Sequence, residues 1–357
     1  MKRAIVPIFA ASLLVVLFVA VSCSKTNMTS GGGTAEPTNS ESSQVLINGA
    51  GSTFDYPAFT QWFQAYKKID PSVQFNYQSI GSGGGQQDLL QQTVDFGASD
   101  APMTDETMAK APGKILHVPI VCGGVAIAYN LPGNPQLKLD GPTLADIFLG
   151  KITKWNDPAI TSQNPGVNLP DTSIIPVHRT EGSGTTYIFT DYLSSVSPEW
   201  KKNVGHSVSV KWPVGLGAKG SEGVSGQVRQ LPGSICYVEL AYAIQTHMSY
   251  AEVKNAAGNY TSPTLDAVSA ALATARIPPD FRFSMVNPPG DNVYPIAGVS
   301  WVLVYQHQAN AERGEKLVKF LEWAVTEGQN ITPSLDYAPL PPNVQKEIAA
   351  ELNTITY

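Results

Sequence analysis

Three short segments rich in glycine, serine and threonine have the composition of anion-binding turns: Gly49–Phe54, Gly81–Gly85 and His178–Thr186. Each follows a run typical of a strand and precedes apolar residues at helical spacing. A turn that opens a helix presents unpaired backbone N–H groups at the positive end of the helix dipole, and its hydroxyl side chains add further donors. This chemistry suits an oxyanion. For one segment alone, a solvated glycine turn with an N-cap would explain the pattern equally well.

The third segment also contains a cation, Arg179, whose forked guanidinium suits a tetrahedral oxyanion. Ser183 and Thr185 follow it as hydroxyl donors. Because the same order of strand, turn and helix occurs three times, we expect the three turns to converge on one anion. The chain has no G-x-x-x-x-G-K-S/T motif, so the phosphate loop of a nucleotide hydrolase is not predicted.

A fourth segment, Val94–Pro102, contains an acid, Asp100, at the end of a strand-like run. A carboxylate only accepts hydrogen bonds, so Asp100 would attract an oxyanion that carries a proton, such as hydrogen phosphate. It would repel sulfate, because an unpaired buried charge is costly. The alternative is that Asp100 caps the turn before Pro102.

The composition limits the class of protein. The 357 residues include 23 Lys+Arg and 29 Asp+Glu, a net charge of −6, which leaves no basic surplus for binding a nucleic acid. Hydrophobic residues make up 43% of the chain, enough for a folded core. The 3 cysteines and 5 histidines show no metal-ligand spacing, so neither a metal nor another cofactor is expected.

The N-terminus has the pattern of an export signal, because residues 1–22 join the charged start Met1–Arg3 to an apolar run. Small residues directly before Cys23 resemble a bacterial lipoprotein signal, which predicts lipidation of Cys23 and attachment to a membrane. The alternative is a plain secretory signal, since the apolar run is short for a transmembrane anchor. Residues 23–44 are predicted to form a flexible tether.

From Val45 onward, strand-like and helix-like patterns alternate, which is typical of an α/β fold with a largely parallel sheet. Thr143 is the expected N-cap of a short helix, and 125–129 is expected to continue a strand between two lobes. The patterns predict strands at 45–48, 73–78, 94–99, 115–121, 125–129, 174–177 and 297–305, and helices at 57–69, 85–94, 144–149, 265–275, 310–327 and 342–352.

A middle region dense in proline and glycine indicates a division into two lobes. Both ends of the mature chain are expected to form the first lobe, at 45–126 and 296–357, and the second lobe would span 127–295. A cleft between two such lobes is a preferred place for a ligand. Hinge motion is expected where the chain crosses between the lobes, near 125–130 and 290–297.

Eight segments stand in an order that is specific to one family: Gly49–Phe54, Ile80–Gly84, Val94–Asp100, Lys154–Asp157, Glu181–Thr185, Lys211–Gly217, Leu231–Ser234 and Leu335–Ala338. Through them the chain resembles the PstS family of phosphate-binding proteins, the extracytoplasmic receptors of phosphate ABC importers. The resemblance covers essentially all of 45–357. It implies a two-lobed α/β periplasmic-binding-protein fold, type II-like, in which each lobe is a mostly parallel sheet flanked by helices and the ligand lies in the interlobe cleft.

The resemblance also implies a set of phosphate-binding residues: Thr53, Phe54, Ser82, Asp100, Arg179, Ser183, Gly184 and Thr185. Asp100 would accept the proton of phosphate and Arg179 would form the charged contact, while the others would supply hydroxyl and N–H donors. The implied protein is a monomer outside the cytoplasm, anchored to the membrane by a lipid on Cys23. It would deliver inorganic phosphate to the transmembrane permease subunits of an importer, and it would be a binding protein rather than an enzyme.

Some positions depart from the usual pattern of the family. Glu181 stands where an Asp usually follows the ligand Arg, and its pairing with that Arg is left open. Ser52 replaces a smaller residue, and His178 stands where a second Arg can occur; both could tune affinity. Cys122 and Cys236 could form a disulfide in an exported protein, but two separate buried thiols are favoured.

Two other functions compete with phosphate transport. An extracellular phosphatase would use Ser183 as its nucleophile, with His178 as the only candidate base nearby in sequence. Five residues across a glycine turn do not place that base on the nucleophile, and no metal motif supports hydrolysis. Alternatively, the same scaffold could bind another oxyanion, such as sulfate or molybdate, although Asp100 argues against a ligand without a proton.

Overall fold

The computed structural model describes residues 44–357. The predicted export signal at 1–22, the lipidation of Cys23 and, except for Gln44, the tether at 23–44 lie outside the described residues. Contacts group the described residues into one compact unit. Within 44–357, no helix is both long enough and apolar enough to cross a membrane.

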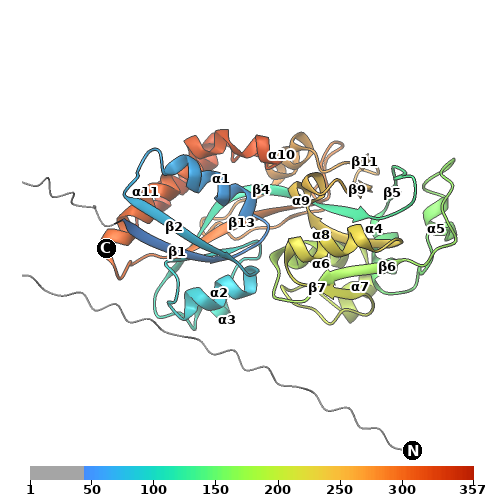
Figure 1. Ribbon diagram of the computed structural model, residues 1–357, viewed down its shortest axis with the longest axis horizontal. Helices are drawn as coiled ribbons and strands as arrows, with labels where there is room; N and C mark the ends of the chain where they lie inside the picture. Colours follow the sequence, from blue (N-terminus) through green and yellow to red (C-terminus); the bar gives the residue numbers. More distant parts are fainter. Residues whose placement is uncertain (1–43) are drawn as a thin grey trace, which may run out of the picture. The chain divides into compact units, whose positions relative to one another are not determined.

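The strands form one large sheet and one small sheet (Figure 1). They are β1 (Val45–Gly51), β2 (Val73–Ser79), β3 (Phe96–Ser99), β4 (Ile115–Tyr129), β5 (Lys138–Leu139), β6 (Ile175–Arg179), β7 (Leu216–Ala218), β8 (Ser234–Glu239), β9 (Ser249–Tyr250), β10 (Glu252–Lys254), β11 (Tyr260–Thr261), β12 (Met285–Val286) and β13 (Ile296–Tyr305). The large sheet has the order β2-β1-β3-β13-β4-β8-β6-β7, with β12 paired to β13 and β9 to β4. β1 is parallel to β2 and β3, and β6 is parallel to β7 and β8, whereas β4 and β13 are antiparallel to their neighbours.

The helices flank this large sheet. They are α1 (Tyr56–Tyr66), α2 (Ser82–Leu90), α3 (Asp105–Met108), α4 (Gly141–Phe148), α5 (Pro158–Thr161), α6 (Gly184–Val196), α7 (Pro198–Asn203), α8 (Gly220–Gln230), α9 (Leu240–Gln245), α10 (Leu265–Thr274), α11 (Ala311–Val325) and α12 (Pro342–Leu352), with 3₁₀ turns at Glu327–Asn330 and Thr332–Leu335. In Figure 1, β1, β2, α1 and α11 lie on one side, and β6, β7, α6 and α8 on the other. We call the group of β1–β3, α1–α3, α11 and α12 the first lobe, and the group of β6–β8 and α4–α9 the second lobe.

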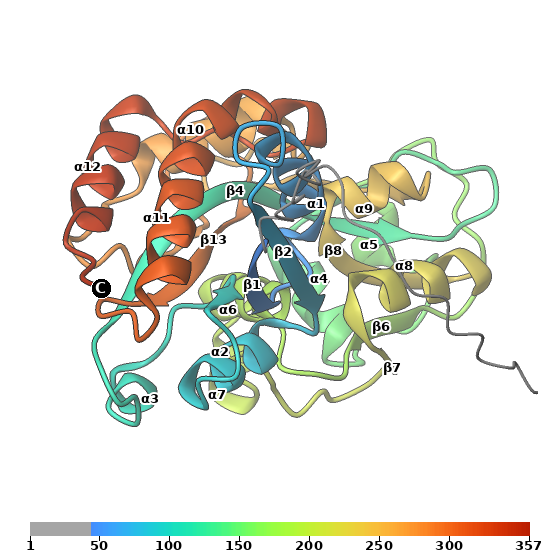
Figure 2. The same cartoon turned by 60° about the vertical axis from the view of Figure 1, so that its left-hand side comes forward.

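Two long strands, β4 and β13, join the lobes, and Figure 2 shows α10, α11 and α12 beside them. All 15 residues of β4 are buried. Its first part pairs with β13, and its last part, Val125–Tyr129, pairs with β8 of the second lobe. The prediction of a continuous strand between the lobes is therefore confirmed, and its near-continuous apolar sequence is typical of a strand covered on both faces. The lobe limits at 126/127 and 295/296 stay a prediction.

The predicted ends of α1 and α4 are wrong. α1 ends at Tyr66, and Ile69 beyond it is 58% exposed, so Ile69 belongs to the helical pattern only by coincidence of spacing. α4 has Asp140 rather than Thr143 as its N-cap: the Asp140 carboxylate accepts the N–H of Thr143 at 2.9 Å. Thr143 is therefore inside the helix, because an aspartate three residues earlier is a strong N-cap acceptor.

The two cysteines within the described residues, Cys122 and Cys236, are free and buried. The favoured prediction of two separate thiols is confirmed. Burial raises the pKa of the Cys122 thiol to about 12. Both side chains therefore act as small apolar core residues rather than reactive thiols.

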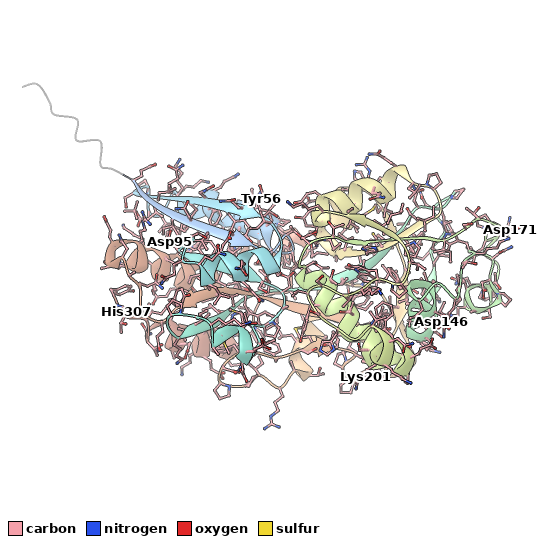
Figure 3. All side chains as sticks on the ribbon, turned by 90° about the horizontal axis from the view of Figure 1, so that it is seen from below. Tyr56, Asp95, Asp146, Asp171, Lys201 and His307 are labelled. Carbon is pink, nitrogen blue, oxygen red and sulfur yellow. The ribbon has the colours of Figure 1, made fainter. Side chains whose placement is uncertain are left out.

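Charged side chains lie mostly at the surface, as Asp146, Asp171 and Lys201 of the second lobe illustrate (Figure 3). Two carboxyl groups of the first lobe are exceptions, since Asp55 is 0% exposed and Asp100 is 2% exposed. A buried carboxylate is costly unless hydrogen-bond donors or a proton compensate its charge. The surroundings of these two acids must therefore supply that compensation.

Candidate anion-binding site

All eight predicted site residues are buried in one region where the lobes meet. They are Thr53, Phe54, Ser82, Asp100, Arg179, Ser183, Gly184 and Thr185. They follow β1 and β3, end β6, or begin α2 and α6. Contacts cross between the lobes, since the Gly184 N–H donates to Ser82 Oγ at 3.0 Å and the Gly83 N–H donates to the Gly182 carbonyl at 2.8 Å. The structure therefore brings the predicted turns together.

The first turn, between β1 and α1, contains Thr53 and Phe54. Thr53 Oγ1 lies 2.7 Å from Oγ of Ser221 on the second lobe. The resemblance implied that the Phe54 N–H binds a phosphate oxygen, but in the structure this N–H donates to Ser52 Oγ at 2.9 Å. The reason is the hydroxyl at position 52, where the family often has a smaller residue.

The second turn contributes Ser82, the first residue of α2. Its Oγ accepts the N–H of Asp100 at 3.1 Å and that of Gly184 at 3.0 Å. A serine oxygen that accepts two N–H groups keeps its own proton free to donate. α2 begins at Ser82, earlier than predicted, because Gly81 takes φ +92° and turns the chain directly into the helix. The helix ends at Leu90, short of the predicted 94.

The third turn contains Arg179, which is 5% exposed and is held by Glu181. Arg179 Nε lies 2.6 Å from Glu181 Oε1, and Nη2 contacts the same oxygen. Nη1 lies 3.4 Å from the hydroxyl oxygens of Thr185 and Ser221. Glu181 thus pairs with Arg179 despite replacing the usual aspartate, and the free edge of the guanidinium faces two hydroxyl groups.

Ser183 is the N-cap of α6, and its Oγ accepts the N–H of Thr186 at 3.1 Å. The N-cap interpretation is correct for Ser183, but the turn is buried rather than solvated. Gly184 follows without a positive φ. A Cβ on Gly184 would lie 2.5 Å from both Asp100 Cβ and Ser82 Oγ, so glycine is required for the close approach of the lobes.

Asp100 directly follows β3, and its carboxylate faces hydroxyl groups. Oδ1 accepts the hydroxyl of Ser52 and, at 2.9 Å, that of Ser300 on β13. The side chain therefore bonds to the site rather than to the turn before Pro102. Burial raises the pKa of Asp100, although these donors and the charge of Arg179 act in the opposite direction. Asp100 is a hydrogen-bond acceptor among groups that mostly donate.

Sequence reasoning missed Ser221, the second residue of α8, which is 0% exposed and contacts both Thr53 and Arg179. The signal was the same as in the other turns, namely a strand, then Gly220 with φ +73°, then a hydroxyl at a helix start. β7 before it has only 3 residues, too few for a recognisable apolar pattern. Asp55 and Ser300 also contact the site and were missed.

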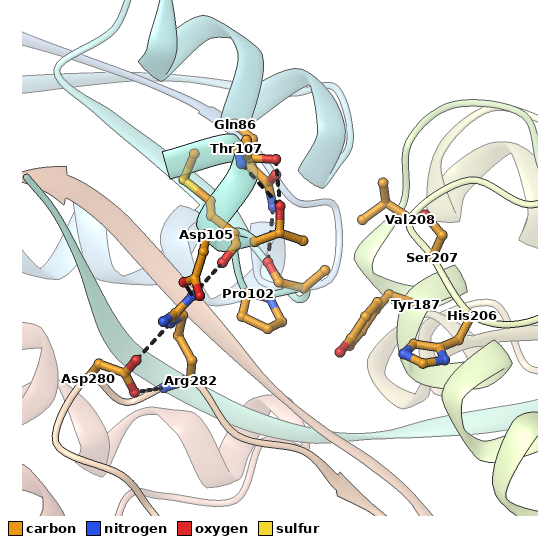
Figure 4. A pocket seen from close by; sticks show the side chains of 13 residues that line it. Gln86, Pro102, Asp105, Thr107, Tyr187, His206, Ser207, Val208, Asp280 and Arg282 are labelled. Carbon is orange, nitrogen blue, oxygen red and sulfur yellow. Dashed lines mark hydrogen bonds and ion pairs between the residues drawn. The ribbon is translucent and has the colours of Figure 1, made fainter. Parts of the chain in front are cut away.

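A pocket of about 620 Å³ lies beside the site, between the lobes (Figure 4). One wall is Ala101–Asp105, which directly follows Asp100, and the facing wall includes Tyr187 and His206–Val208 of the second lobe. Arg282 forms an ion pair with Asp105 at 2.7 Å on the first wall. None of the eight predicted residues lines this pocket. They pack against one another next to it.

The hydrolytic alternative lacks its base. The His178 ring stacks on Trp212 with ring centroids 4.9 Å apart, and its Nδ1 lies 3.1 Å from the Arg179 carbonyl. No hydrogen bond in the described residues joins His178 to Ser183, whose oxygen caps α6. A nucleophile needs an adjacent base, so Ser183 is not activated in this way. Residues 44–357 also contain no group of three or more His, Cys, Asp or Glu side chains that could hold a metal ion.

The chain matches known proteins over most of its length. Residues 33–327 match the model of the PBP superfamily domain. The phosphate-binding protein PstS of Pasteurella multocida is 45% identical over 312 residues, which are 86% of this chain and 90% of that protein. The phosphate-binding protein PstS of Xylella fastidiosa strain Temecula1 is 45% identical over 323 residues, which are 89% of this chain and 87% of that protein.

Solved structures show the same fold. A high affinity periplasmic phosphate-binding protein bound with phosphate aligns with a TM-score of 0.70 and 23% identity, over 86% of this chain and 93% of that one. This likeness confirms the predicted two-lobed α/β fold. The relatives at 45% identity are named as binding proteins, which confirms the prediction of a binding protein rather than an enzyme. With these identities and this coverage, the chain belongs to the PstS family of phosphate-binding proteins.

Proposed function

We propose that this protein binds inorganic phosphate at the buried interlobe site and delivers it to the transmembrane permease subunits of a phosphate ABC importer. Membership of the PstS family supports the proposal. The observation that carries it is that the hydroxyl oxygens of the site already accept hydrogen bonds from the protein. Their protons are therefore left to be donated to an anion.

The hydroxyl oxygens of the site already accept hydrogen bonds from the protein. Ser82 Oγ accepts two backbone N–H groups, and Ser183 Oγ accepts one. Thr185 Oγ1 accepts the guanidinium of Arg179. Each hydroxyl carries one proton. Those of Ser183 and Thr185 are free to donate, and that of Ser82, beside the Asp100 carboxylate, can turn to the anion. Hydroxyl donors at converging helix N-termini, beside a guanidinium, form a site for a tetrahedral oxyanion.

Thr53 fits the same scheme through Ser221. An arginine only donates, so the Ser221 oxygen accepts from Arg179. We propose that Ser221 directs its own proton to Thr53 Oγ1, 2.7 Å away, since either hydroxyl of this pair can be the donor. The Thr53 proton is then available to the ligand. Ser221 would thereby orient the first turn toward the anion without binding it.

Asp100 would act as the filter. Its Oδ1 is occupied by Ser52 and Ser300, whereas Oδ2 would lie only 2.6 Å from a Cβ on Gly184 and so faces the start of α6. Hydrogen phosphate can donate its proton to that oxygen. Sulfate has no proton to donate and would meet a buried negative charge, which opposes its binding.

Binding would require the lobes to separate and close, because the site residues are buried where the lobes meet. Opening would break the bond between Gly184 N–H and Ser82 Oγ, and hinges near 125–130 and 290–297 would allow it. On closure, phosphate oxygens would take the N–H groups of Phe54 and Gly184 from their serine acceptors. Fixed backbone donors would then replace the hydration shell of the ion.

We propose an extracytoplasmic location and a lipid anchor on Cys23, supported by the sequence of residues 1–23. We also propose a monomeric state, as the resemblance to the family implies. Expression with labelled palmitate tests the anchor. We expect label in the wild type and none in Cys23→Ala, which should be released from membranes. Membrane retention of unlabelled Cys23→Ala would contradict it.

The test of phosphate selection is Asp100→Asn, measured by titration calorimetry with phosphate and with sulfate. The asparagine amide can donate to a fully deprotonated oxyanion. We expect the ratio of phosphate to sulfate affinity to fall by about tenfold or more, equivalent to about 1.4 kcal/mol. Asp171→Asn at the exposed surface is the control and should leave the ratio unchanged.

Two results would contradict the proposal. If the wild type does not bind phosphate, the function is wrong. If the wild type binds phosphate but Asp100→Asn excludes sulfate as strongly as the wild type does, Asp100 is not the filter.

A further inference from the structure

Two buried carboxyl groups share one hydroxyl group at the back of the site. Ser300 Oγ lies 2.7 Å from Asp55 Oδ2 and 2.9 Å from Asp100 Oδ1. All three residues are at most 2% exposed. A β-bulge in β13 between Ser300 and Trp301 lies at this position, a feature that commonly re-aims a side chain. The hydroxyl carries one proton, so it can donate to only one of the two acids. The other acid must bring its own proton and donate to Ser300.

The surroundings of Asp100 favour its ionised form. Besides Ser300, Oδ1 accepts the hydroxyl of Ser52, whose oxygen in turn accepts the Phe54 N–H at 2.9 Å. The Ser52 proton is therefore committed to Asp100. The positive charge of Arg179 also stabilises the Asp100 carboxylate. The hydroxyl groups of Ser52, Ser300 and Ser82, together with the cation, thus compensate this one negative charge.

The surroundings of Asp55 favour its protonated form. Asp55 occupies the N-cap position of α1, but its side chain makes no cap hydrogen bond. Apart from Ser300, its donor is the Tyr77 hydroxyl at 3.3 Å, and that hydroxyl lies closer, at 2.7 Å, to the Ser52 carbonyl. Burial, together with the neighbouring Asp100 carboxylate, raises the pKa of Asp55 well above its usual range.

The other titratable groups that act on this pair of acids do not change the assignment. They are Tyr77, Tyr242, Tyr337, Glu239 and Arg179. Burial raises the pKa values of the tyrosines, which keeps them uncharged near neutral pH, and it also raises the pKa of the Glu239 carboxyl. The cation among them, Arg179, acts on Asp100. The shared proton therefore belongs on Asp55.

We propose that Asp55 is a positioning residue that holds one proton for the pair, and that this proton keeps Asp100 ionised with Oδ2 as the acceptor presented to phosphate. The inference rests on the proposed function. When Asp55 releases its proton to solvent at alkaline pH, a second negative charge appears behind the anion site. Like charges in one buried site oppose each other and the anionic ligand, so phosphate affinity should fall.

The first experiment measures phosphate affinity by titration calorimetry between about pH 6 and pH 9. It compares the wild type with Asp55→Asn, whose amide can donate to Ser300 but cannot ionise, and with Asp55→Ala, which cannot donate. We expect the wild-type affinity to fall at alkaline pH by about tenfold more than that of Asp55→Asn. At neutral pH, Asp55→Ala should bind more weakly than Asp55→Asn, so that the amide restores part of the loss.

At each pH, the variant and the wild type meet phosphate in the same protonation state. The ratio of their affinities therefore reports only the change in the protein. Asp171→Asn is the surface control and should follow the wild-type profile. Equal pH profiles for the wild type and Asp55→Asn would overturn the inference while leaving phosphate binding intact. Absence of phosphate binding in the wild type would instead overturn the proposed function.

The second experiment needs no phosphate, and its main signal comes from the wild type, so it does not rest only on variants that fold. Infrared spectra of the wild type should contain a carbonyl band of a protonated carboxylic acid at neutral pH, and this band should fade at alkaline pH. Asp55→Asn should lack it, whereas Glu239→Gln should retain it. If Asp55→Asn removes no carboxylic-acid band from the wild-type spectrum, Asp55 is ionised and the inference is overturned.

Discussion

Gly184 illustrates how a single residue governs the contact between the lobes. Its N–H donates to Ser82 Oγ, and the space where a side chain would begin is filled by Asp100. Its φ is not positive, so the turn conformation does not require glycine here. Glycine is needed because Asp100 and Ser82 of the first lobe occupy the place of a Cβ at position 184. The turns of the two lobes converge only with this close approach.

Gly184→Ala should weaken phosphate binding. Its Cβ would lie 2.5 Å from Asp100 Cβ, closer than real side chains allow, so the lobes could not close fully. Overpacking of this kind typically costs about 1–3 kcal/mol, which predicts a loss of affinity of about tenfold to a hundredfold in titration calorimetry.

The matched control is Gly226→Ala within α8, where an added Cβ meets no atom within 4 Å. Its affinity for phosphate should equal that of the wild type. Wild-type affinity in Gly184→Ala would show that the close approach at Asp100 is not part of the binding form.

At the scale of elements, β4 shows how one strand can serve two lobes. Its side chains are buried on both faces along its full length, and it pairs first with β13 and then with β8. The strand also contains a buried histidine, His117, which is 4% exposed. Its Nε2 accepts the N–H of Met103 at 3.0 Å, in the segment that follows Asp100.

His117 should make stability depend on pH. Burial, with a smaller effect of Arg282, lowers its pKa to about 4, whereas an unfolded histidine titrates near about 6.5. Between these values the unfolded state binds a proton that the folded state does not. Stability is therefore lost as pH falls from about 6.5 toward about 4, by up to about 3 kcal/mol.

Urea unfolding of the wild type and His117→Gln over this pH range measures the effect. The glutamine oxygen can still accept the Met103 N–H, so the variant should lose less stability on acidification than the wild type. His307→Gln at the exposed surface is the control and should behave like the wild type. Identical pH slopes for the wild type and His117→Gln would exclude this role of His117.

At the scale of the whole molecule, the lobes share one sheet. β4 and β13 run through it, so neither lobe can lose its central strands without the other. We expect the described part of the chain to unfold in one cooperative transition. A ligand that binds only the folded state raises the free energy of unfolding by about 2.7 kcal/mol at a hundredfold excess over Kd.

Differential scanning calorimetry should therefore show one transition whose Tm rises with phosphate and not with sulfate at equal ionic strength. The shift should grow with the logarithm of phosphate concentration. Two separate transitions, of which phosphate moves only one, would mean that the lobes unfold independently and that the shared strands do not couple them.

Several features of the fold and site could be predicted from the sequence because they depend on residues close together in the chain. Strand, glycine, hydroxyl and helix start recur at Gly49–Phe54, Gly81–Gly85 and His178–Thr186 in the predicted order, although Gly49–Gly51 belong to β1 and Ser82–Gly85 to α2. The strand through 115–129 follows from two largely apolar runs, 115–121 and 125–129, which continue as one strand across Gly123 and Gly124. These are local signals. Some helix and strand ends were misplaced where a competing cap or turn residue decided the boundary, and elements such as β7, α8 and β8 were not predicted.

Other features were decided only by the tertiary structure, because they depend on which distant segments meet. Ser221 joins the site through a strand too short to recognise, and Ser300 reaches Asp55 across 245 positions of sequence. In the sequence, Asp55 has the pattern of an ordinary helix cap, yet its side chain turns inward to a second acid. Whether a buried carboxyl group keeps its proton depends on the donors and charges around it, and those are set by packing rather than by neighbours in the chain.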